Sequence, residues 1–440
     1  MKVFDKTWKL AVAGALVGVL AALLAYFGNP ANMAICIACF VRDTAGALKL
    51  HSAAPVQYFR PEIVGFAVGA FAISLATNEY KATAGSSPMI RFVLGAIMVI
   101  GALVFLGCPL RMVLRMAAGD LNAYVALVGF AGGIATGSFF LKKGFSLGRA
   151  YETQKSSGYV LPVLLLALFI IGAVTGVYAA STEGPGSKHA PVLISLVAAL
   201  LIGALAQKSR MCFAGSIRDV ILMKNFDLLS IIGALFAVML IFNLATGNFH
   251  LSFSGQPIAH SQHLWNILGM YAVGFAAVLA GGCPLRQIIL AGQGSSDSAV
   301  TFLGMLFGAA LAHNFNLVGA AAKAATETEA AVLGGPAMPG KIAVIVCIAQ
   351  KKPIKRQHFK KEKRKRKMSD FVEVDVRGLS CPEPVLMVMD AMDEHPGKQI
   401  RVLGDEAHTR TNIERTLEYH GKEGHTEVLE NGCFTITFEA

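Results

Sequence analysis

The chain has 440 residues, of which 54% are hydrophobic and only 15% are charged. Soluble domains carry about 25% charged residues, so this composition excludes an ordinary soluble protein and indicates a membrane protein. The net charge is +10 over residues 1–350, +10 over 351–367 and −9 over 370–440. The sequence therefore predicts a membrane domain at 1–350, a basic linker at 351–367 and a soluble domain at 368–440.

A helix that crosses a bilayer needs about 20 mostly apolar residues. The first candidate follows Lys2, Lys6 and Lys9, a pattern that also fits a signal peptide, but its length and the later spans favour a membrane span. Pro336 and Pro339 interrupt the last candidate, so nine and ten spans both remain open. The predicted spans are 8–27, 61–78, 89–107, 121–141, 159–180, 190–207, 228–246, 264–282, 298–318 and 332–350.

Two further apolar segments, 33–50 and 209–224, are too short and too charged to cross a bilayer comfortably. Each contains an Arg-Asp dipeptide, which we interpret as a structural ion pair in preference to a substrate contact. Irregular backbone at membrane depth is tolerated only where protein or water covers it. We therefore predict that both segments are re-entrant half-helices.

The basic residues predict the orientation, because short cytoplasmic loops are rich in Lys and Arg. The loop 142–158 and the linker 351–367 are basic, whereas the loops 181–189 and 247–263 carry little positive charge. The soluble domain is thus predicted to be cytoplasmic, on a multi-pass protein of the bacterial inner membrane. Ten spans place the N-terminus inside, and nine place it outside.

The membrane part contains an internal repeat. Gly-Cys-Pro-Leu-Arg occurs at 107–111 and again at 282–286. Upstream of each copy, a Cys-Phe dipeptide is followed by an Arg-Asp dipeptide, within 39–43 and within 212–219. The number of residues between the two Arg-Asp dipeptides is almost the same as the number between the two Gly-Cys-Pro-Leu-Arg motifs. Two features at matched spacing indicate a duplication.

The duplication divides the membrane part into repeat one, about 8–141, and repeat two, about 190–318. Five predicted spans separate the starts of the two copies, so the copies are expected to have opposite topology. Inverted repeats are common in transporters, which bind substrate near the midplane where the copies meet. The predicted fold class is therefore a polytopic α-helical domain with pseudo-symmetric, inverted repeats and re-entrant half-helices.

The repeated motif has a physical logic. Glycine lets the chain turn, and proline suits the first turn of the following helix. The cysteine then lies at a helix N-terminus, where free N–H groups attract anions. The arginine is either an anion-attracting group or an interfacial anchor. The supporting residues are Gly107, Pro109, Arg111, Gly282, Pro284 and Arg286.

Four membrane cysteines are predicted to line a substrate path: Cys39, Cys108, Cys212 and Cys283. Cys36, which has no evident counterpart in the second copy, is an alternative to Cys39 as the residue that lines the path. A buried cysteine is often only a small hydrophobe, which is our interpretation of Cys347 and Cys433.

The chemistry of these thiols indicates the cargo. Thiols are weak donors and soft, polarizable groups that suit an anion with exposed sulfur or selenium. Carboxylates are nearly absent from the spans, which argues against a cation carrier. The cysteine spacing does not fit a zinc site, and no metal or cofactor is predicted.

The linker 351–367 reads KKPIKRQHFKKEKRKRK. Basic runs bind either nucleic acid or anionic lipid headgroups, and a position directly after a membrane span favours the lipid. The linker is therefore predicted to contact the bilayer surface and not nucleic acid.

The soluble part is predicted to fold as a small α+β domain of order βαβαββ. The strand 371–377 alternates polar and apolar residues, and Cys-Pro-Glu-Pro follows it at 381–384. The next apolar residues recur at helical spacing up to Gly397. The remaining predicted elements are a strand at 399–404, a helix at 406–420 and strands at 425–430 and 433–438.

Two prolines spaced in this way fit only the first turn of a helix, which places Cys381 at the N-cap. The helix dipole and the free N–H groups favour its thiolate. The motif continues with Pro382, Glu383 and Pro384, and apart from Glu383 it offers no side chain that could act as a base for the cysteine. This lack of a base favours a sulfur carrier over a hydrolase. Cys381 is therefore the predicted catalytic residue.

At these residues the soluble part resembles the TusA/SirA-like family of sulfur-carrier domains, including its YeeD and YedF types. The resemblance covers 370–440 and rests on the Cys-Pro-x-Pro motif at 381–384. It implies that Cys381 carries sulfur as a persulfide. The YedF type is linked to selenium metabolism.

The membrane part resembles the YeeE/YedE family through the motifs at 107–111 and 282–286 and through Cys212-Phe213. The YeeE members take up thiosulfate along a line of membrane cysteines, whereas the YedE branch is tied to selenium. The resemblance therefore implies an importer but leaves the substrate open.

Together these features predict an importer of thiosulfate, or of a similar sulfur or selenium oxyanion, fused to a domain that accepts sulfur at Cys381. Expected partners are the small anion, anionic lipids and cytosolic sulfur-relay proteins. One alternative is a transporter for a selenium compound. Another is a membrane-anchored sulfurtransferase without transport, and a sensor module ranks lower because no signalling domain is visible.

Overall fold

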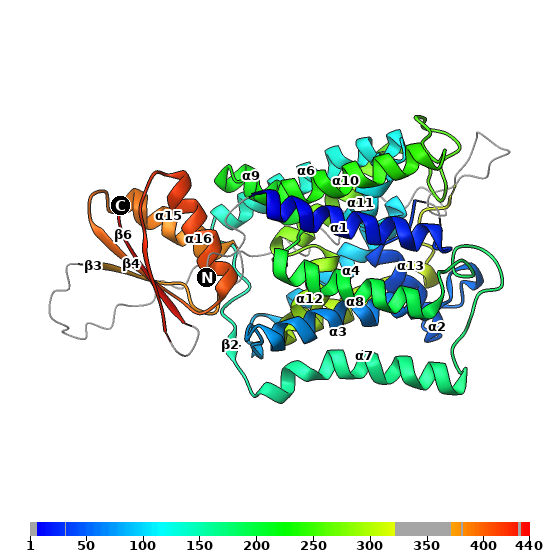
Figure 1. The fold of residues 1–440 in the computed structure, drawn as a ribbon, viewed down its shortest axis with the longest axis horizontal. Helices are drawn as coiled ribbons and strands as arrows, with labels where there is room; N and C mark the ends of the chain where they lie inside the picture. The colour runs from blue at the N-terminus through cyan, green and yellow to red at the C-terminus, as the bar shows by residue number, and fades with distance from the viewer. Residues whose placement is uncertain (1–6, 31, 322–370, 380–381, 430–432) are drawn as a thin grey trace.

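The computed structural model describes residues 7–30, 32–321, 371–379, 382–429 and 433–440. Long apolar helices make up most of the chain before residue 321 and form one bundle (Figure 1). They are α1 (Thr7–Tyr26), α3 (Pro61–Ala76), α4 (Pro88–Phe105), α6 (Leu121–Lys142), α7 (Lys155–Thr175), α8 (Val192–Ser209), α10 (Asp227–Ala245), α11 (His263–Leu279) and α13 (Ser296–Asn314).

These helices coincide with the first nine predicted spans. Within the described residues, eight helical segments are long and apolar enough to cross a membrane, and α13 is not among them. The chain is thus a multi-pass membrane protein. The tenth predicted span, 332–350, and the predicted domain boundaries at 350 and 368 lie outside the described residues.

Four short helices, each much shorter than a complete membrane span, interrupt this pattern. They are α2 (Ile37–Ala47), α5 (Pro109–Ala117), α9 (Phe213–Met223) and α12 (Pro284–Gln293). At a rise of about 1.5 Å per residue, helices of 9 to 11 residues cross only about half of a bilayer. The helices α2 and α9 lie within the two segments that the sequence predicted to be half-helices.

The two copies of the repeat correspond element by element. The starts of α2 and α9, α4 and α11, α5 and α12, and α6 and α13 keep the same offset in residue number to within one position. Contacts between the copies are reciprocal, since α6 packs on α11 as α13 packs on α4, and α3 packs on α8 as α10 packs on α1. The helix α7 connects the copies and lies at the edge of the bundle (Figure 1).

Glycines bring these helix pairs close together. A Cβ atom at Gly129 would lie 2.1 Å from the carbonyl oxygen of Ile267. At the equivalent positions of the repeat, a Cβ atom at Gly304 would lie 2.1 Å from the carbonyl oxygen of Phe92. Small residues allow such backbone approach in membrane helices, so the same close packing is built twice.

The C-terminal domain has the predicted order βαβαββ. Its four-stranded sheet has the order β3-β4-β6-β5, in which β3 and β4 are parallel and the other neighbours are antiparallel. Alternate residues such as Val402, Ile436 and Phe438 are buried. The elements are β3 (Phe371–Asp375), α15 (Glu383–Glu394), β4 (Gln399–Gly404), α16 (Ala407–Tyr419), β5 (His425–Val428) and β6 (Phe434–Glu439).

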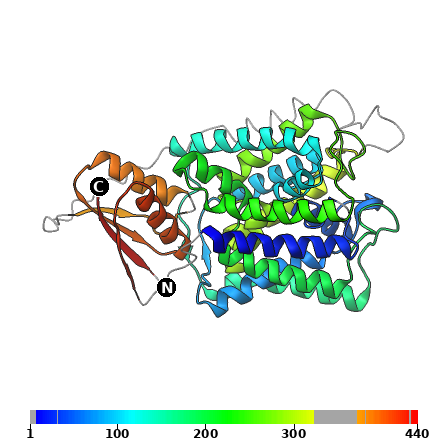
Figure 2. The ribbon, with the colours of Figure 1, turned by 45° about the horizontal axis from the view of Figure 1, so that its top comes forward.

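This domain lies at one end of the bundle, and its helices lie on the side that faces the membrane part (Figures 1 and 2). One predicted detail differs: α15 has Pro382 at its N-cap, one residue later than the predicted cap, because Glu383 and Pro384 occupy the first helical turn. The predicted cap residue, Cys381, lies outside the described residues.

Candidate functional site

A cysteine precedes each of the four short helices. Cys36, Cys108, Cys212 and Cys283 are the N-cap residues of α2, α5, α9 and α12. Prolines occupy the first turn of α5 and α12, as predicted, because that position requires no N–H donor. The sequence logic that placed thiols at helix N-termini is therefore correct for the repeated motif.

The counterpart of Cys212 is Cys36, and the sequence prediction that Cys36 has no counterpart is wrong. The Sγ of Cys36 accepts a hydrogen bond from the N–H three residues later, at 3.4 Å, and the Sγ of Cys212 does the same at 3.2 Å. Cys36 and Cys212 each precede their Arg-Asp pair by six residues, a signal that the shared Cys-Phe dipeptide concealed. Cys39 is an additional thiol of repeat one.

Repeat one gathers three thiols in its interior. The Sγ atoms of Cys36 and Cys39 are 2.9 Å apart, and Cys36 also lies within hydrogen-bonding reach of Cys108. All three side chains are buried. The structure thus brings Cys39 and Cys108, two of the predicted path residues, into one cluster with Cys36.

Repeat two holds the other two predicted path residues. The thiols of Cys212 and Cys283 lie within hydrogen-bonding reach of each other. Cys283 is buried, whereas Cys212 retains 7% of its surface and lines a cavity. The two copies therefore hold equivalent thiol pairs, both buried, and one thiol of repeat two, Cys212, borders the cavity.

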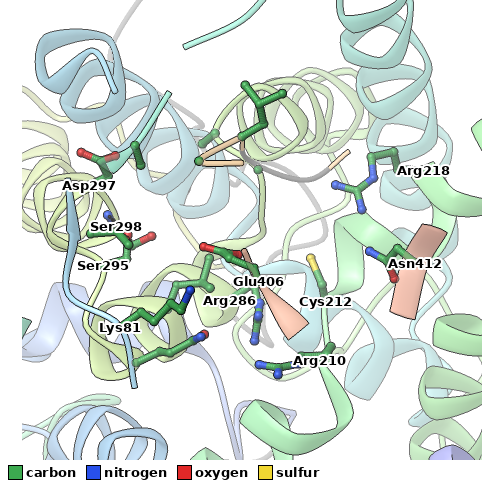
Figure 3. Close-up of a pocket in the computed structure, with 18 of the residues that line it drawn as sticks. Lys81, Arg210, Cys212, Arg218, Arg286, Ser295, Asp297, Ser298, Glu406 and Asn412 are labelled. Carbon is green, nitrogen blue, oxygen red and sulfur yellow. Dashed lines mark hydrogen bonds between the residues drawn. The ribbon is translucent and has the colours of Figure 1, made fainter. Parts of the chain in front are cut away.

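The cavity has a volume of about 100 Å³ and lies where the membrane part meets the C-terminal domain. One water molecule needs about 10–15 Å³ by this measure, so the space admits a small anion or several waters. Cys212 lies among arginines from different helices, close to Glu406 of the C-terminal domain (Figure 3). Gly378 and Leu379, which precede the Cys-Pro-Glu-Pro motif, also line it.

Basic side chains outnumber acidic ones around this cavity. Ion pairs compensate much of this charge: Arg218 with Asp219, Arg91 with Asp297, Arg210 with Glu79, Lys81 with Glu152 and Arg415 with Asp227. A cleft with an excess of one sign of charge concentrates ions of the opposite sign, so the basic groups exposed in this cavity favour an anion over a cation. Its basic residues are Lys81, Arg91, Arg210, Arg218, Arg286 and Arg415, and its acidic residues are Asp219, Asp297 and Glu406.

The sequence did not point to four of these basic residues, Lys81, Arg91, Arg210 and Arg415. Lys81 and Arg210 follow the ends of long helices, where single basic residues usually indicate only the orientation of the helix in the membrane. Arg415 lies on α16 and joins the cavity only because the C-terminal domain docks there. Within the described ranges, no three His, Cys, Asp or Glu side chains gather as metal ligands would.

The motif glycines act differently from the prediction that they allow the turn. The left-handed backbone occurs one residue earlier, at Leu106 with φ 62° and at Gly281 with φ 81°. A Cβ atom at Gly107 would instead lie 3.0 Å from the Cδ of Arg111. At Gly282 it would lie 2.8 Å from the Cγ of Arg286, so both glycines make room for the motif arginine.

Polar contacts attach the C-terminal domain to the loop that joins α6 to α7. The N–H of Ala150 donates to the carbonyl of Gly378 at 2.7 Å, and Arg149 donates to the carbonyl of Asp375 at 2.8 Å. Elsewhere, Arg415 of α16 forms an ion pair with Asp227 at 3.1 Å. These contacts hold residues 378–379 beside the cavity.

Asp375 provides a test of this attachment by pH. Burial raises the pKa of its carboxyl group, but hydrogen bonds from Arg377 and the charge of Arg149 outweigh burial and hold the pKa below its usual value. The carboxylate therefore adds stability above about pH 4, the pKa in the unfolded chain, and this stability is lost as the pH falls through the lower folded-state pKa.

We expect Asp375→Asn to destabilise the C-terminal domain at pH 7 by about 0.5–1 kcal/mol, a range typical of exposed ion pairs. Scanning calorimetry of the full-length protein at several pH values measures the effect. The difference from the wild type should shrink in acid, where Asp375 is protonated in both folded and unfolded chains. The exposed Glu423→Gln serves as control, and a deficit independent of pH would contradict the assignment.

The fold and the cysteine sites define a class of protein: a membrane bundle with clustered internal thiols, one of which borders a cavity shared with a small α+β domain. Residues 208–375 match a family described as "Sulphur transport", and residues 372–439 match one described as "Sulfurtransferase TusA". The chain therefore resembles the YeeE/YedE sulphur-transport family over 208–375 and a TusA-like domain over 372–439, which confirms the resemblance for these residues. No curated protein matches the chain.

The first match contains Cys212 and Cys283 together with the Arg286 motif, whereas repeat one lies outside it. The second contains the Cys-Pro-Glu-Pro motif at 381–384. Both matched descriptions concern sulfur, so the chain is related to sulfur transport.

Proposed function

We propose that this protein imports thiosulfate, or a similar sulfur or selenium oxyanion, across the bacterial inner membrane. The observation that carries the proposal is the series of thiols: three buried in repeat one, then Cys212 and Cys283 beside a positively lined cavity. The C-terminal domain borders that cavity with Gly378 and Leu379. The cargo would leave the thiols directly beside the sulfur-carrier domain.

The chemistry of the path favours a soft anion. A thiol offers a weak S–H donor and a polarizable sulfur, which suit the terminal sulfur of thiosulfate or a selenium analogue. The N–H groups of α5 and α12, with Arg111 and Arg286, suit its charged oxygens. The proposed path runs past Cys39 and Cys36 to Cys108, and then past Cys283 to Cys212.

An inverted arrangement of the repeats is part of the proposal. The helix α1 begins near Asp227, which pairs with Arg415 of the C-terminal domain, so α1 starts at the end where that domain docks. Its counterpart α8 ends near Arg210, which lines the cavity at that same end. Opposite directions of equivalent helices support inverted topology, the usual build of transporters with a central substrate site.

Cys381 is proposed to receive the sulfur. Its thiolate would attack the terminal sulfur of thiosulfate, the S–S bond would break, and sulfite would leave with the bonding electron pair. The product is a persulfide on Cys381, ready for cytosolic sulfur-relay proteins. Pro382, Glu383 and Pro384 would present this cysteine at the start of α15.

The proposal also includes the orientation of the protein in the membrane, with the C-terminal domain in the cytoplasm. The C-terminal domain docks on the α6–α7 loop, which carries Lys143 and Arg149 and follows Lys142 at the end of α6. This supports a cytoplasmic position for both, because basic loops stay inside. The linker 351–367 would contact anionic lipid headgroups.

Uptake in a bacterial strain that cannot make cysteine from sulfate tests the function. We expect the full-length chain to support growth on thiosulfate and accumulation of ³⁵S-labelled thiosulfate, with labelled selenite compared in parallel. Accumulation of selenite but not thiosulfate would reassign the substrate to selenium. No accumulation of either, with thiosulfate cleaved by membranes, would favour the membrane-anchored sulfurtransferase, which the TusA match makes the second candidate. Retained uptake after deletion of 368–440 would locate transport in the bundle.

A further inference from the structure

The two motif arginines are equivalent in sequence but differ in their surroundings. Arg111 is completely buried, and its Nε donates to the carbonyl of Asn32 at 2.8 Å. Its other nitrogens donate to the carbonyls of Leu106 and Ile258 and to the Sγ of Cys39, at 3.2 Å for Ile258 and 3.5 Å for Cys39. One guanidinium thus ties together the α1–α2 loop, the end of α4 and the α10–α11 loop.

Its counterpart Arg286 lines the cavity beside the C-terminal domain (Figure 3). Arg286 donates to the side-chain Oε1 of Gln207 on α8 at 3.3 Å, whereas the α1–α2 loop offers Arg111 a backbone carbonyl at Asn32. By the offset between the two motifs, Gly281 and Thr83 correspond to Leu106 and Ile258, and both border the cavity. The region that Arg111 closes in repeat one is open in repeat two.

A buried ion pair shows the same asymmetry between the two repeats. In repeat one, Arg115 and Asp120 form a buried ion pair at 2.6 Å just beyond Arg111 on α5. The equivalent positions in repeat two are Leu290 and Ser295, which line the cavity. The described conformation is therefore closed at the end away from the C-terminal domain and open at the end beside it.

Arg111 also carries a charge that its partners do not neutralise. Among the described residues, its recorded partners are backbone carbonyls and a thiol, all of them neutral. Buried charges are usually paired with an opposite charge. An anion would form stronger, charge-assisted hydrogen bonds with the same nitrogens and would compete with the carbonyls.

We propose that Arg111 is an anion-responsive gate on the side opposite the C-terminal domain. Without cargo it ties the three segments shut over Cys36, Cys39 and Cys108. A small dianion displaces the carbonyls, takes the guanidinium as its counter-ion and so reaches the thiols. The inference rests on the proposed transport function, since it assigns the entry step of that path.

Thiol accessibility tests the gate without requiring transport. Intact cells carrying the full-length protein are treated briefly with an anionic, membrane-impermeant methanethiosulfonate, and labelling is read at each cysteine by peptide mass spectrometry. We expect Arg111→Ala to raise labelling of Cys36, Cys39 and Cys108 about tenfold, because buried thiols react only when the structure opens locally. Arg111→Lys keeps the charge but lacks the planar fork that holds several carbonyls, and should give a smaller rise.

The matched control is Arg286→Ala, which removes the same motif residue from the other copy and should leave labelling of the repeat-one thiols unchanged. In a misfolded variant Cys283 would also be labelled, so protection of Cys283 at the wild-type level shows that a variant is folded. If Arg111→Ala fails this check, the Arg111→Lys variant is used for the test. If a folded Arg111 variant protects the repeat-one thiols from labelling as well as the wild type does, the proposed gate is wrong. Absence of uptake by the wild type would instead overturn the proposed function, so the two failures are distinguishable.

Discussion

Replacing Cys283 with alanine is expected to reduce thiosulfate uptake to the background of cells without the protein. Cys283 lies at the N-cap of α12 and within hydrogen-bonding reach of Cys212, which lines the cavity. A hydrogen bond to a charged group contributes about 1.5–3 kcal/mol, so losing one at this position should slow passage roughly 10- to 100-fold. Initial rates of ³⁵S-thiosulfate accumulation measure the effect.

Two further variants sharpen this experiment. Cys212→Ala removes the neighbouring thiol and should lower uptake to a similar degree, since both sulfurs contact the same cargo. Cys433→Ala removes a partly exposed cysteine of the C-terminal domain and should leave uptake intact. Wild-type uptake by the Cys283→Ala variant, at equal protein level in the membrane, would show that the cargo takes another route.

The second large effect concerns a buried charge network in repeat one. Asp43 forms ion pairs with Arg42 and with Arg60, each at 2.7 Å, and all three side chains are buried. Asp43→Ala leaves two guanidinium groups without their carboxylate. Breaking a buried pair in this way destabilises proteins by about 3–5 kcal/mol, a large part of a typical total stability of about 5–15 kcal/mol.

Repeat two supplies the control for this variant. Asp219 is the counterpart of Asp43, but it pairs only with Arg218 among the recorded ion pairs and lines the cavity. Water in the cavity can solvate Arg218, so Asp219→Ala should cost clearly less stability. Thermal unfolding of the purified full-length proteins in detergent compares the two, and equal shifts would contradict the expected effect of the second arginine and of the cavity.

Sequence reasoning succeeded where chemistry is local. Apolar runs predicted nine helices closely, and the proline after each motif cysteine predicted the N-termini of α5 and α12. The βαβαββ order followed from alternation and turn residues in the same way. Each of these features depends on neighbouring residues along the chain, which a single sequence displays directly.

It failed where two segments had to be compared in three dimensions. The dipeptide Cys-Phe matched Cys39 with Cys212, whereas the helix caps match Cys36 with Cys212. The motif glycines were assigned to a turn, yet they make space for Arg111 and Arg286. Only the packed structure shows which atoms a missing side chain would have met.

The sequence by itself determined that this is a duplicated membrane protein with repeated cysteine motifs and a tethered βαβαββ domain, because hydropathy, helix capping and motif repetition are encoded locally. The tertiary structure decided that Cys212 opens to a cavity shared with the C-terminal domain while Arg111 closes repeat one. These differences arise from contacts between segments far apart in the sequence, such as Arg111 with Asn32 and Ile258. Two copies of one motif therefore have identical local sequence but unequal surroundings.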